Sequence, residues 1–540
     1  MQKKSHDASA LKEQLTLRGI VIGMIGSVII TTSSMYVALR MGALPWPTIF
    51  VAILSMTILK AMGNTNLNEI NVTHTAMSAG AMVAGGLAFT IPGIWMLDKT
   101  LHVSAVSLLV ITLGGTILGA IFTALIRKYF IEREKLPFPM GIAASETVLA
   151  GDEGGGKAKV LFGSLGITAI FVAIRDWFGK IPSVWMPQIL VAKNIYFGMS
   201  VSPMAVAIGY IIGPLFIGMW FLGALISYFF IIPVGLSQGW FANIEAANAF
   251  KDSLGIGLMV GTGIGILLKG IIPKAKEIYG PMISGKAARE GDVNLKWAPF
   301  LFVLVAFLFI IFTEMRLVPS ILTIVGVWLT TAMAATITGQ TGINPMEIFG
   351  IIILLAVKAL YKTAGIEAFL IAAVVAVACG LAGDVLNDFK SGYILKTNPR
   401  AQLISEMVGG IIGAVVSVVV LLVMLKAYGS MGPGTELPAP QAYAVSAMVG
   451  GLPNTTSFII GLIIGLALYL LNIPGMTLGI GIYLPMTISS AAFIGGAIRF
   501  IVSKVKPESQ EKGTIISSGL LGGEGVTGVL ISIIKVFTMS

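Results

Sequence analysis

Long apolar runs without a charged residue recur along this chain, and they restrict its fold more than any other feature. The run from Gly19 to Leu39 has 21 residues, and Val201 to Leu236 and Leu437 to Ile498 are much longer. A helix needs about 20 apolar residues to cross a bilayer, and it satisfies its own backbone amides. The sequence therefore predicts an all-α, polytopic integral membrane bundle with about 14 to 17 transmembrane segments.

Proline and glycine divide the two longest runs. Pro214 interrupts the first, which we interpret as two crossings. The second contains several glycines and prolines and is interpreted as three crossings, or as one crossing with re-entrant pieces. Broken or re-entrant helices are therefore part of the predicted fold, because lipid tolerates irregular backbone only where protein or a water-filled cavity covers it.

Composition and charge agree with a membrane location. Hydrophobic residues make up 56% of the chain and charged residues 11%, against about 25% charged residues in soluble domains. With a cytoplasmic N-terminus, 24 of the 35 Lys and Arg fall on the inner side, which is the positive-inside pattern. The +10 net charge therefore indicates orientation and not a nucleic-acid partner. We expect a cytoplasmic tail over 1–18, one transmembrane domain over 19–540, and a plasma or inner membrane location.

Several kinds of chemistry find no support in the sequence. Cys379 is the one cysteine, only three histidines are present, and no HExxH motif occurs. A membrane enzyme acting on lipid-linked substrates would need a nucleophile and base or a metal set, and a passive channel would need a repeated filter motif. These two classes remain minor alternatives, and no metal and no cofactor are expected.

Polar residues within the third apolar segment form one helical stripe. Asn71, His74, Thr75 and Ser78 stand at positions i, i+3, i+4 and i+7. Polar side chains at membrane depth face a cavity or pathway, or they hold neighbouring helices together by hydrogen bonds. Both readings stay open for this stripe. His74 favours a functional role, because its charge can change near physiological pH.

A second candidate element follows Leu136. Two prolines in Leu136-Pro-Phe-Pro139 precede a short apolar piece that carries Glu146. This pattern favours a broken or re-entrant helix, the kind of element that presents helix ends to substrates in transporters. The alternative is that Glu146 caps a helix at the membrane interface.

Further polar groups close other apolar runs. Thr338, Gln340 and Asn344 end one run. Asp384 and Asp388 end another run and are candidate site residues. The alternative is that they pair with the nearby bases Lys390 and Arg400.

Two glycine-rich segments complete the candidates. The glycines and proline around Tyr483 are expected to loosen the helix and free backbone carbonyls. Glu524 is an acid placed between glycines near the last span.

These motifs, in this order, resemble the oligopeptide transporter (OPT) superfamily in its prokaryotic branch, over about residues 15 to 535. Asp388-Phe-Lys-Ser-Gly-Tyr393 with Pro399-Arg400 is the most specific of them, and the stripe from Asn71 to Ser78, Leu136-Pro-Phe-Pro139 and Gly481-Ile-Tyr-Leu-Pro485 accompany it. One departure is His74, where the family pattern usually has glutamine.

The resemblance implies a helical secondary transporter driven by the proton gradient and, by analogy with relatives, a homodimer. It implies two substrate classes. The first is small oligopeptides or peptide-like solutes, and the alternative is yellow-stripe-like uptake of metal-chelate complexes with amino-acid-derived ligands.

Our hypothesis from the sequence is proton-coupled symport, in which protonation of a buried acid lowers the cost of reorienting the loaded carrier. The residues expected to couple protons are Glu146, Asp384, His74 and Glu524. The residues expected to bind substrate are Asn71, His74, Thr75, Ser78, Thr338, Gln340, Asn344 and Tyr483.

Overall fold

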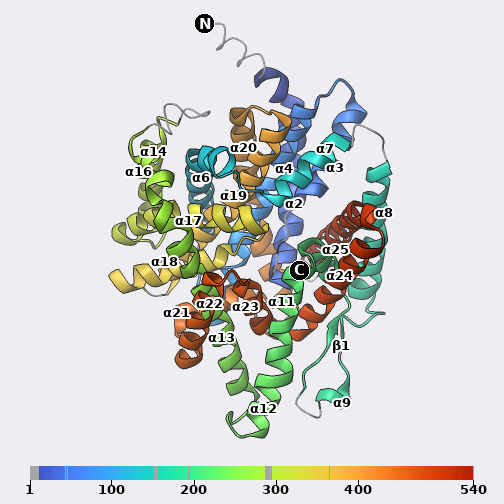
Figure 1. Ribbon diagram of the computed structural model, residues 1–540, viewed down its shortest axis with the longest axis vertical. Helices are drawn as coiled ribbons and strands as arrows, with labels where there is room; N and C mark the ends of the chain where they lie inside the picture. Colours follow the sequence, from blue (N-terminus) through green and yellow to red (C-terminus); the bar gives the residue numbers. More distant parts are fainter. Residues whose placement is uncertain are drawn as a thin grey trace.

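The computed structural model describes residues 11–42, 44, 47–150, 156–191, 195–285, 295–363 and 365–538. Helices form almost all of this part of the chain (Figure 1). The described residues contain one pair of two-residue strands, β1 (Val184–Trp185) and β2 (Met199–Ser200), which are antiparallel with Val184 opposite Ser200. The predicted all-α bundle is confirmed. Part of the expected tail, residues 1–10, lies outside the described residues.

A first group of helices packs around α19 (Ile366–Leu395), and all 18 residues of the most apolar stretch of α19 are buried. Small and branched residues from Ala372 to Ala382 let neighbouring helices approach it on every side. Helices of this group contact one another in sequence-distant pairs, such as α4 with α20 and α6 with α19. The first group comprises α19 with α2 (Leu17–Met41), α4 (Leu67–Ala88), α6 (Ala105–Lys128), α17 (Leu317–Thr341), α18 (Met346–Leu360) and α20 (Pro399–Tyr428).

A second group of helices packs beside the first. Its closest pairs are α13 with α22, α13 with α23, α11 with α23 and α10 with α24. The second group comprises α10 (Pro203–Ile212), α11 (Pro214–Leu225), α13 (Ile244–Gly265), α22 (Thr455–Leu470), α23 (Gly475–Tyr483), α24 (Met486–Val505) and α25 (Gln510–Thr538).

Shorter elements connect or flank the two groups. Among the described residues, four π-helical and two 3₁₀ segments extend or join longer helices, for example Tyr129–Arg133 after α6 and Ile266–Ile271 after α13. The remaining α-helices are α3 (Thr48–Met62), α5 (Pro92–Leu97), α7 (Pro139–Ala150), α8 (Gly156–Val172), α9 (Gln188–Val191), α12 (Ile232–Ser237), α14 (Ala275–Ile283), α16 (Ala298–Phe312) and α21 (Pro440–Gly450).

Eleven helices of the described chain are long and apolar enough to span a bilayer, and three more apolar helices are shorter. The pair α21 and α22 is bent by 118°, so the broken or re-entrant pieces expected between Leu437 and Ile498 are present. Gly213 separates α10 from α11 with a φ of 95°, a backbone that favours glycine, and Pro214 then starts the next helix. The predicted break at Pro214 is confirmed.

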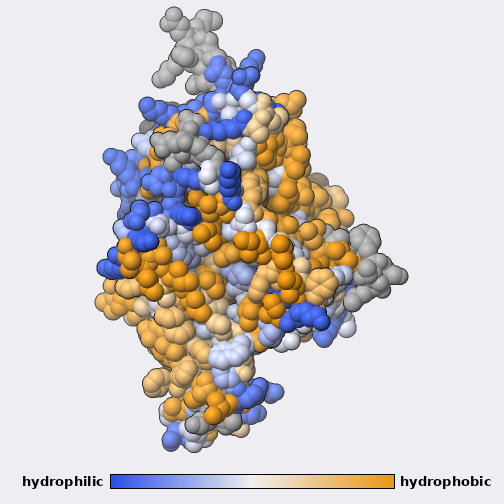
Figure 2. Space-filling model, turned by 90° about the vertical axis from the view of Figure 1, so that its right-hand side faces the viewer, coloured by the Kyte–Doolittle hydropathy of each residue, from blue (hydrophilic) through white to orange (hydrophobic). Residues whose placement is uncertain are grey.

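The surface agrees with a bilayer environment. Hydrophobic residues cover much of the face in Figure 2, and hydrophilic residues gather toward its upper end and at its lower tip. On α16, Phe300, Val303 and Phe307 are 61%, 69% and 55% exposed. Exposed apolar side chains on this scale need a lipid or protein covering.

Candidate functional site

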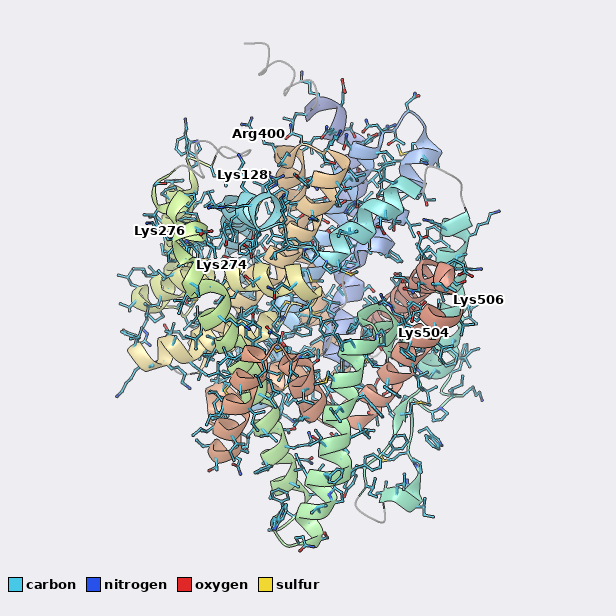
Figure 3. The ribbon with its side chains drawn as sticks, viewed as in Figure 1. Lys128, Lys274, Lys276, Arg400, Lys504 and Lys506 are labelled. Carbon is cyan, nitrogen blue, oxygen red and sulfur yellow. The ribbon has the colours of Figure 1, made fainter. Side chains whose placement is uncertain are left out.

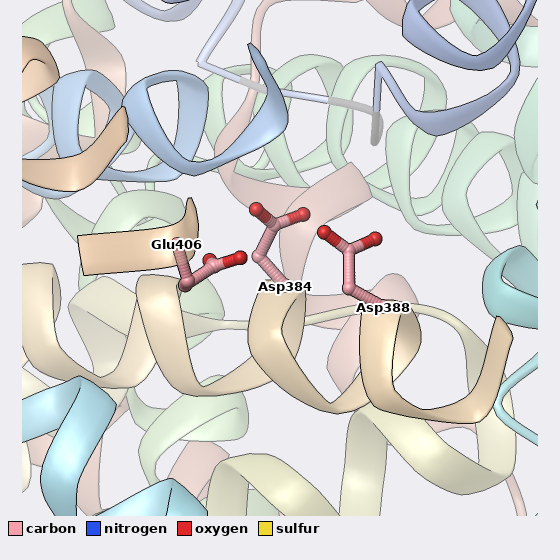
Figure 4. A group of neighbouring side chains, drawn as sticks. All are labelled: Asp384, Asp388 and Glu406. Atoms are coloured by element: carbon pink, nitrogen blue, oxygen red, sulfur yellow. The ribbon is translucent and has the colours of Figure 1, made fainter. Parts of the chain in front are cut away.

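Three carboxyl groups meet in the interior of the first group. Asp384 and Asp388 lie one turn apart on α19, and Glu406 lies on the adjacent α20 (Figure 4). One oxygen from each of the three lies within 4.8 Å of the others, and each residue is at most 1% exposed. We call Asp384, Asp388 and Glu406 the carboxyl cluster.

The third segment supplies partners to only one member of the carboxyl cluster. His74 Nε2 lies 3.1 Å from Asp388 Oδ1, and the Ser78 hydroxyl donates to Asp388 Oδ2 at 3.0 Å. Asp384 and Glu406 have no hydrogen-bond partner on any carboxyl oxygen among the described residues. Asp388 therefore bonds to α4 instead of pairing with Lys390, whose ammonium donates to the Leu136 carbonyl at 3.0 Å.

A polar layer closes the cluster off at one end. Asn71 donates to Thr397 Oγ1 at 3.0 Å and accepts from Ser391 at 2.7 Å, so this amide joins α4 to the end of α19. Thr75 donates to the Asn71 carbonyl of its own helix. Of the predicted stripe, Asn71, His74 and Ser78 thus contact α19 or the turn that follows it.

The carboxyl cluster cannot carry three negative charges at once. Ionised carboxylates this close repel one another, and burial removes the water that would stabilise them. A proton, a small hard cation or a donor such as water can satisfy the unpartnered oxygens, and the first two also reduce the negative charge of the cluster. The cluster is therefore built to bind positive charge.

Two cavities lie where the two helix groups meet. The first has a volume of about 380 Å³ and the second about 270 Å³, and they share Thr341, Ile343 and Thr477 in their linings. The first cavity is lined by residues that include Glu134, Lys269, Lys274, Thr336, Gln340 and Tyr469. The second is lined by residues that include Pro139, Asn344, Glu347, Gln441, Thr477 and Arg499.

The two cavities differ in how their charged residues are paired. In the first, Lys274 bonds to Glu134, and Lys269 donates to Asn472 Oδ1 at 2.8 Å. In the second, Glu347 and Arg499 have no ion-pair partner among the described residues. The second cavity therefore offers one anionic and one cationic group to a solute.

Short paths join the second cavity to the carboxyl cluster. Met82, which lines the cavity, lies one turn along α4 from Ser78, the donor to Asp388. Asn387 Oδ1 accepts from the Gly141 amide at 3.1 Å, and Gly141 belongs to α7, whose Pro139 lines the same cavity. Both α4 and α7 thus contact α19, which carries Asp384 and Asp388, and both contribute to the lining of the second cavity.

The other predicted residues are distributed over both cavities and the packed interior. Gln340 lines the first cavity and Asn344 the second. Thr338 is buried and bonds to the Ile343 carbonyl at 3.5 Å. Glu146 is exposed on α7, on the helix face that carries Pro139. The Tyr483 hydroxyl donates to the Pro440 carbonyl, and Tyr483 lies outside both linings.

Glu524 lies in a separate buried network. Its carboxylate accepts from Arg175 at 2.8 Å, from the Ser202 hydroxyl at 3.0 Å and from the Met204 amide at 2.9 Å, at the start of α10. Arg175 also bonds to Asp176, which accepts from Arg40 at 3.1 Å. Unlike the carboxyl cluster, this network balances its charges.

Sequence reasoning did not select Glu406, Glu347, Arg499 or Gln441. The first three stand at the edges of apolar runs, where a charged residue indicates the end of a span. Glu406 directly precedes the run 407–425, Glu347 begins the run 347–357, and Arg499 follows Ile498. Helix spacing places these three charged residues at membrane depth, and that position could have identified them as candidate site residues.

The chain is similar to known proteins over most of its length. A family model described as OPT oligopeptide transporter protein matches residues 14–535. A Haemophilus influenzae protein that is provisionally named an oligopeptide transporter is 24% identical over 588 aligned positions, which cover 93% of this chain and 92% of the relative.

Shorter similarities link the chain to plant proteins that are provisionally named metal-nicotianamine transporters. One from Arabidopsis thaliana is 27% identical over 189 residues, covering 29% of this chain and 26% of the relative. One from Oryza sativa subsp. japonica is 27% identical over 180 residues, covering 28% of this chain and 24% of the relative.

Proposed function

Because the chain belongs to the OPT oligopeptide transporter family, we propose that it is a symporter that carries small peptide-like solutes and protons across the membrane together. It is a multi-pass membrane transporter and not an enzyme. The resemblance expected from its motifs is confirmed. Our proposal is that the transported solute is a peptide and that its transport is coupled to protons.

The observation that carries the coupling proposal is the carboxyl cluster with its unpartnered oxygens. Asp384 and Glu406 are fully buried, yet no described group neutralises them. Binding a proton removes a charge that the low-dielectric interior disfavours, and losing it restores repulsion within the cluster. The packing of α4, α19 and α20 would then depend on the protonation of the cluster.

The position of the cavities supports alternating access. Their linings combine residues of both helix groups, such as Asn344 after α17 and Arg499 on α24. Transporters of this general kind move one bundle against another around a solute site at the bundle interface. Because α4 contributes to both the cavity and the cluster, proton binding and solute binding would favour the same rearrangement.

The orientation proposed from the loop charges is supported by where the bases lie. Lys128, Lys274, Lys276 and Arg400 lie in the upper half of Figure 3, whereas Lys504 and Lys506, expected on the same side, lie near its middle. The described start of the chain lies beside them, because the Asn398 amide donates to Gln14 Oε1 at 2.8 Å. The N-terminus would then be cytoplasmic, and a membrane-impermeant thiol reagent should label a Thr100→Cys variant but not a Lys276→Cys variant from outside intact cells.

The coupling proposal is tested with Asp384→Asn and Glu406→Gln in proteoliposomes. An amide keeps the shape of the acid but cannot release a proton, so gradient-driven accumulation of a bound peptide should fall at least about tenfold. Exchange of labelled for unlabelled peptide at equal pH needs no net proton movement and should persist. Glu508→Gln, at an exposed acid, is the matched control.

Two results would contradict this assignment. Full gradient-driven uptake by both amide variants would remove the cluster from the coupling mechanism. Uptake by the wild type that follows a sodium gradient and ignores pH would replace the proton with a metal cation.

A second candidate, uptake of metal chelates, is favoured by the similarity to metal-nicotianamine transporters over 29% of the chain. A chelate of an amino-acid-derived ligand also presents amino and carboxylate groups. Binding of metal-loaded chelate but of neither the free chelator nor a peptide would replace the peptide proposal with this one.

A further inference from the structure

We infer that the second cavity is a two-ended receptor for a zwitterion, in which Glu347 holds the ammonium end of a short peptide and Arg499 holds its carboxylate end. This assignment rests on the proposed function and adds to it the chemical groups that the solute must present. Two charged residues without a described ion-pair partner and two amides, all in the lining of this cavity, support it.

Glu347 lies in the first turn of α18 and is 3% exposed. It lines the second cavity, and no described cation lies in ion-pair contact with it. A buried carboxylate without a partner is costly unless a cation or a proton joins it. A cationic group of a solute in the cavity meets this need.

Two amides in the lining of the second cavity add acceptors. Asn344 Nδ2 donates to the Cys379 carbonyl at 2.7 Å, and Gln441 Nε2 donates to the Gly42 carbonyl at 2.8 Å. These bonds fix which end of each amide is nitrogen, and they leave Asn344 Oδ1 and Gln441 Oε1 buried and without a partner. An ammonium group has three donors and no acceptor, so the unpaired groups at this cavity match it.

Arg499 supplies the opposite charge. Its Nη1 donates to the Tyr210 and Ile211 carbonyls at 2.9 and 2.6 Å, which holds the guanidinium at the end of α10. Its remaining N–H groups have no carboxylate partner among the described residues. A guanidinium fixed in this way is suited to a bidentate contact with a carboxylate.

The pairing pattern separates this cavity from its neighbour. In the first cavity, Glu134 pairs with Lys274, and Lys269 is held by the uncharged Asn472 side chain and the Leu470 carbonyl, so the described lining has no unpaired carboxylate. Among the described residues, neither Glu347 nor Arg499 has a counter-charge, so a zwitterion is the ligand that satisfies both at once. An uncharged solute would leave both groups unpaired.

The test measures binding to the purified full-length protein by calorimetry. The probes are dialanine and trialanine with free ends, with an acetylated amino end, and with an amidated carboxyl end. The wild type should bind the free peptides about 10- to 100-fold more tightly than either blocked form, because each block removes one charged contact.

The variants should separate the two ends. In Glu347→Gln, free and acetylated peptides should bind alike while the amidated form stays disfavoured. In Arg499→Gln, free and amidated peptides should bind alike while the acetylated form stays disfavoured. Glu508→Gln and Lys506→Gln, at exposed positions, are the controls and should keep both preferences. Glu347→Asp retains the charge and should retain the preference for a free amino end if the fold is intact.

The outcomes distinguish this inference from the proposed function. If the wild type binds blocked and free peptides equally, the two-ended receptor is wrong while peptide transport stands. If Glu347→Gln keeps its preference for a free amino end, Glu347 is not the ammonium partner. If the wild type binds no peptide of either length, the peptide proposal fails and this inference fails with it.

Discussion

Buried acids of this protein fall into two kinds at the residue scale. Glu524 accepts three hydrogen bonds and pairs with Arg175. Asp384 and Glu406 accept none from the described residues. Protein groups pair with the first kind, whereas no described group occupies the oxygens of the second, which leaves them open to a proton or a cation. Both looked alike in the sequence, as acids next to apolar runs.

This difference predicts opposite sensitivities to amide substitution. Glu524→Gln removes the charge that neutralises Arg175 and should lower the free energy of unfolding by about 2–3 kcal/mol. Asp384→Asn removes no bond of the described structure and should change it by less than about 1 kcal/mol. Thermal unfolding of both purified variants in one detergent compares them, and equal losses would contradict the distinction.

Sequence reasoning identified part of this site. The polar stripe was found because residues at i, i+3, i+4 and i+7 share one helix face, and His74 and Ser78 do contact Asp388. Glu406 was not found, because its proximity to Asp384 depends on how α20 crosses α19, and no local pattern encodes that distance. Arg499 was missed for the same reason.

At the element scale, glycine lets α4 and α20 cross at close range. A Cβ atom on Gly409 would lie 2.0 Å from the Ala76 carbonyl oxygen, and one on Gly413 would lie 2.3 Å from the Gly80 Cα. Both obstacles are backbone atoms, which cannot turn aside. This crossing brings Glu406 of α20 into the carboxyl cluster beside α4 and α19.

Gly409→Ala should therefore force the two helices apart. We expect a loss of about 1–3 kcal/mol in stability from overpacking, together with weaker gradient-driven uptake because Glu406 moves from the cluster. The control is Gly218→Ala on α11, where a Cβ meets no atom within 4 Å. Thermal unfolding and uptake measure both effects, and a Gly409→Ala protein that matches the control would contradict this account of the crossing.

Elements were more predictable than contacts. Apolar runs located the long helices because a span must be continuous and uncharged, and Pro214 located a break. The glycines and proline around Tyr483 were expected to loosen the helix, and α23 ends at Tyr483, where the Ile482 and Tyr483 carbonyls accept from Ser227 and Lys251. What the sequence did not indicate is that Gly481 also packs against α11, where an added Cβ would lie 1.8 Å from the Trp220 carbonyl oxygen. A glycine's role in packing depends on a neighbour that the local sequence does not reveal.

At the scale of the whole molecule, two helix groups meet around two cavities, and the carboxyl cluster lies inside one of the groups. The sequence predicted a polytopic bundle with broken helices but not this division, because it depends on pairs such as α13 with α22 that are 200 residues apart. From this arrangement we propose that solute in the second cavity and protons at the carboxyl cluster move together.

The most direct test follows the proton itself. Proteoliposomes containing a pH-sensitive dye are prepared at equal internal and external pH, and a peptide that binds the protein is added outside. The account predicts that the lumen acidifies as labelled peptide enters, and that Asp384→Asn abolishes the acidification while peptide exchange continues. Peptide accumulation by the wild type without any change in luminal pH would contradict it.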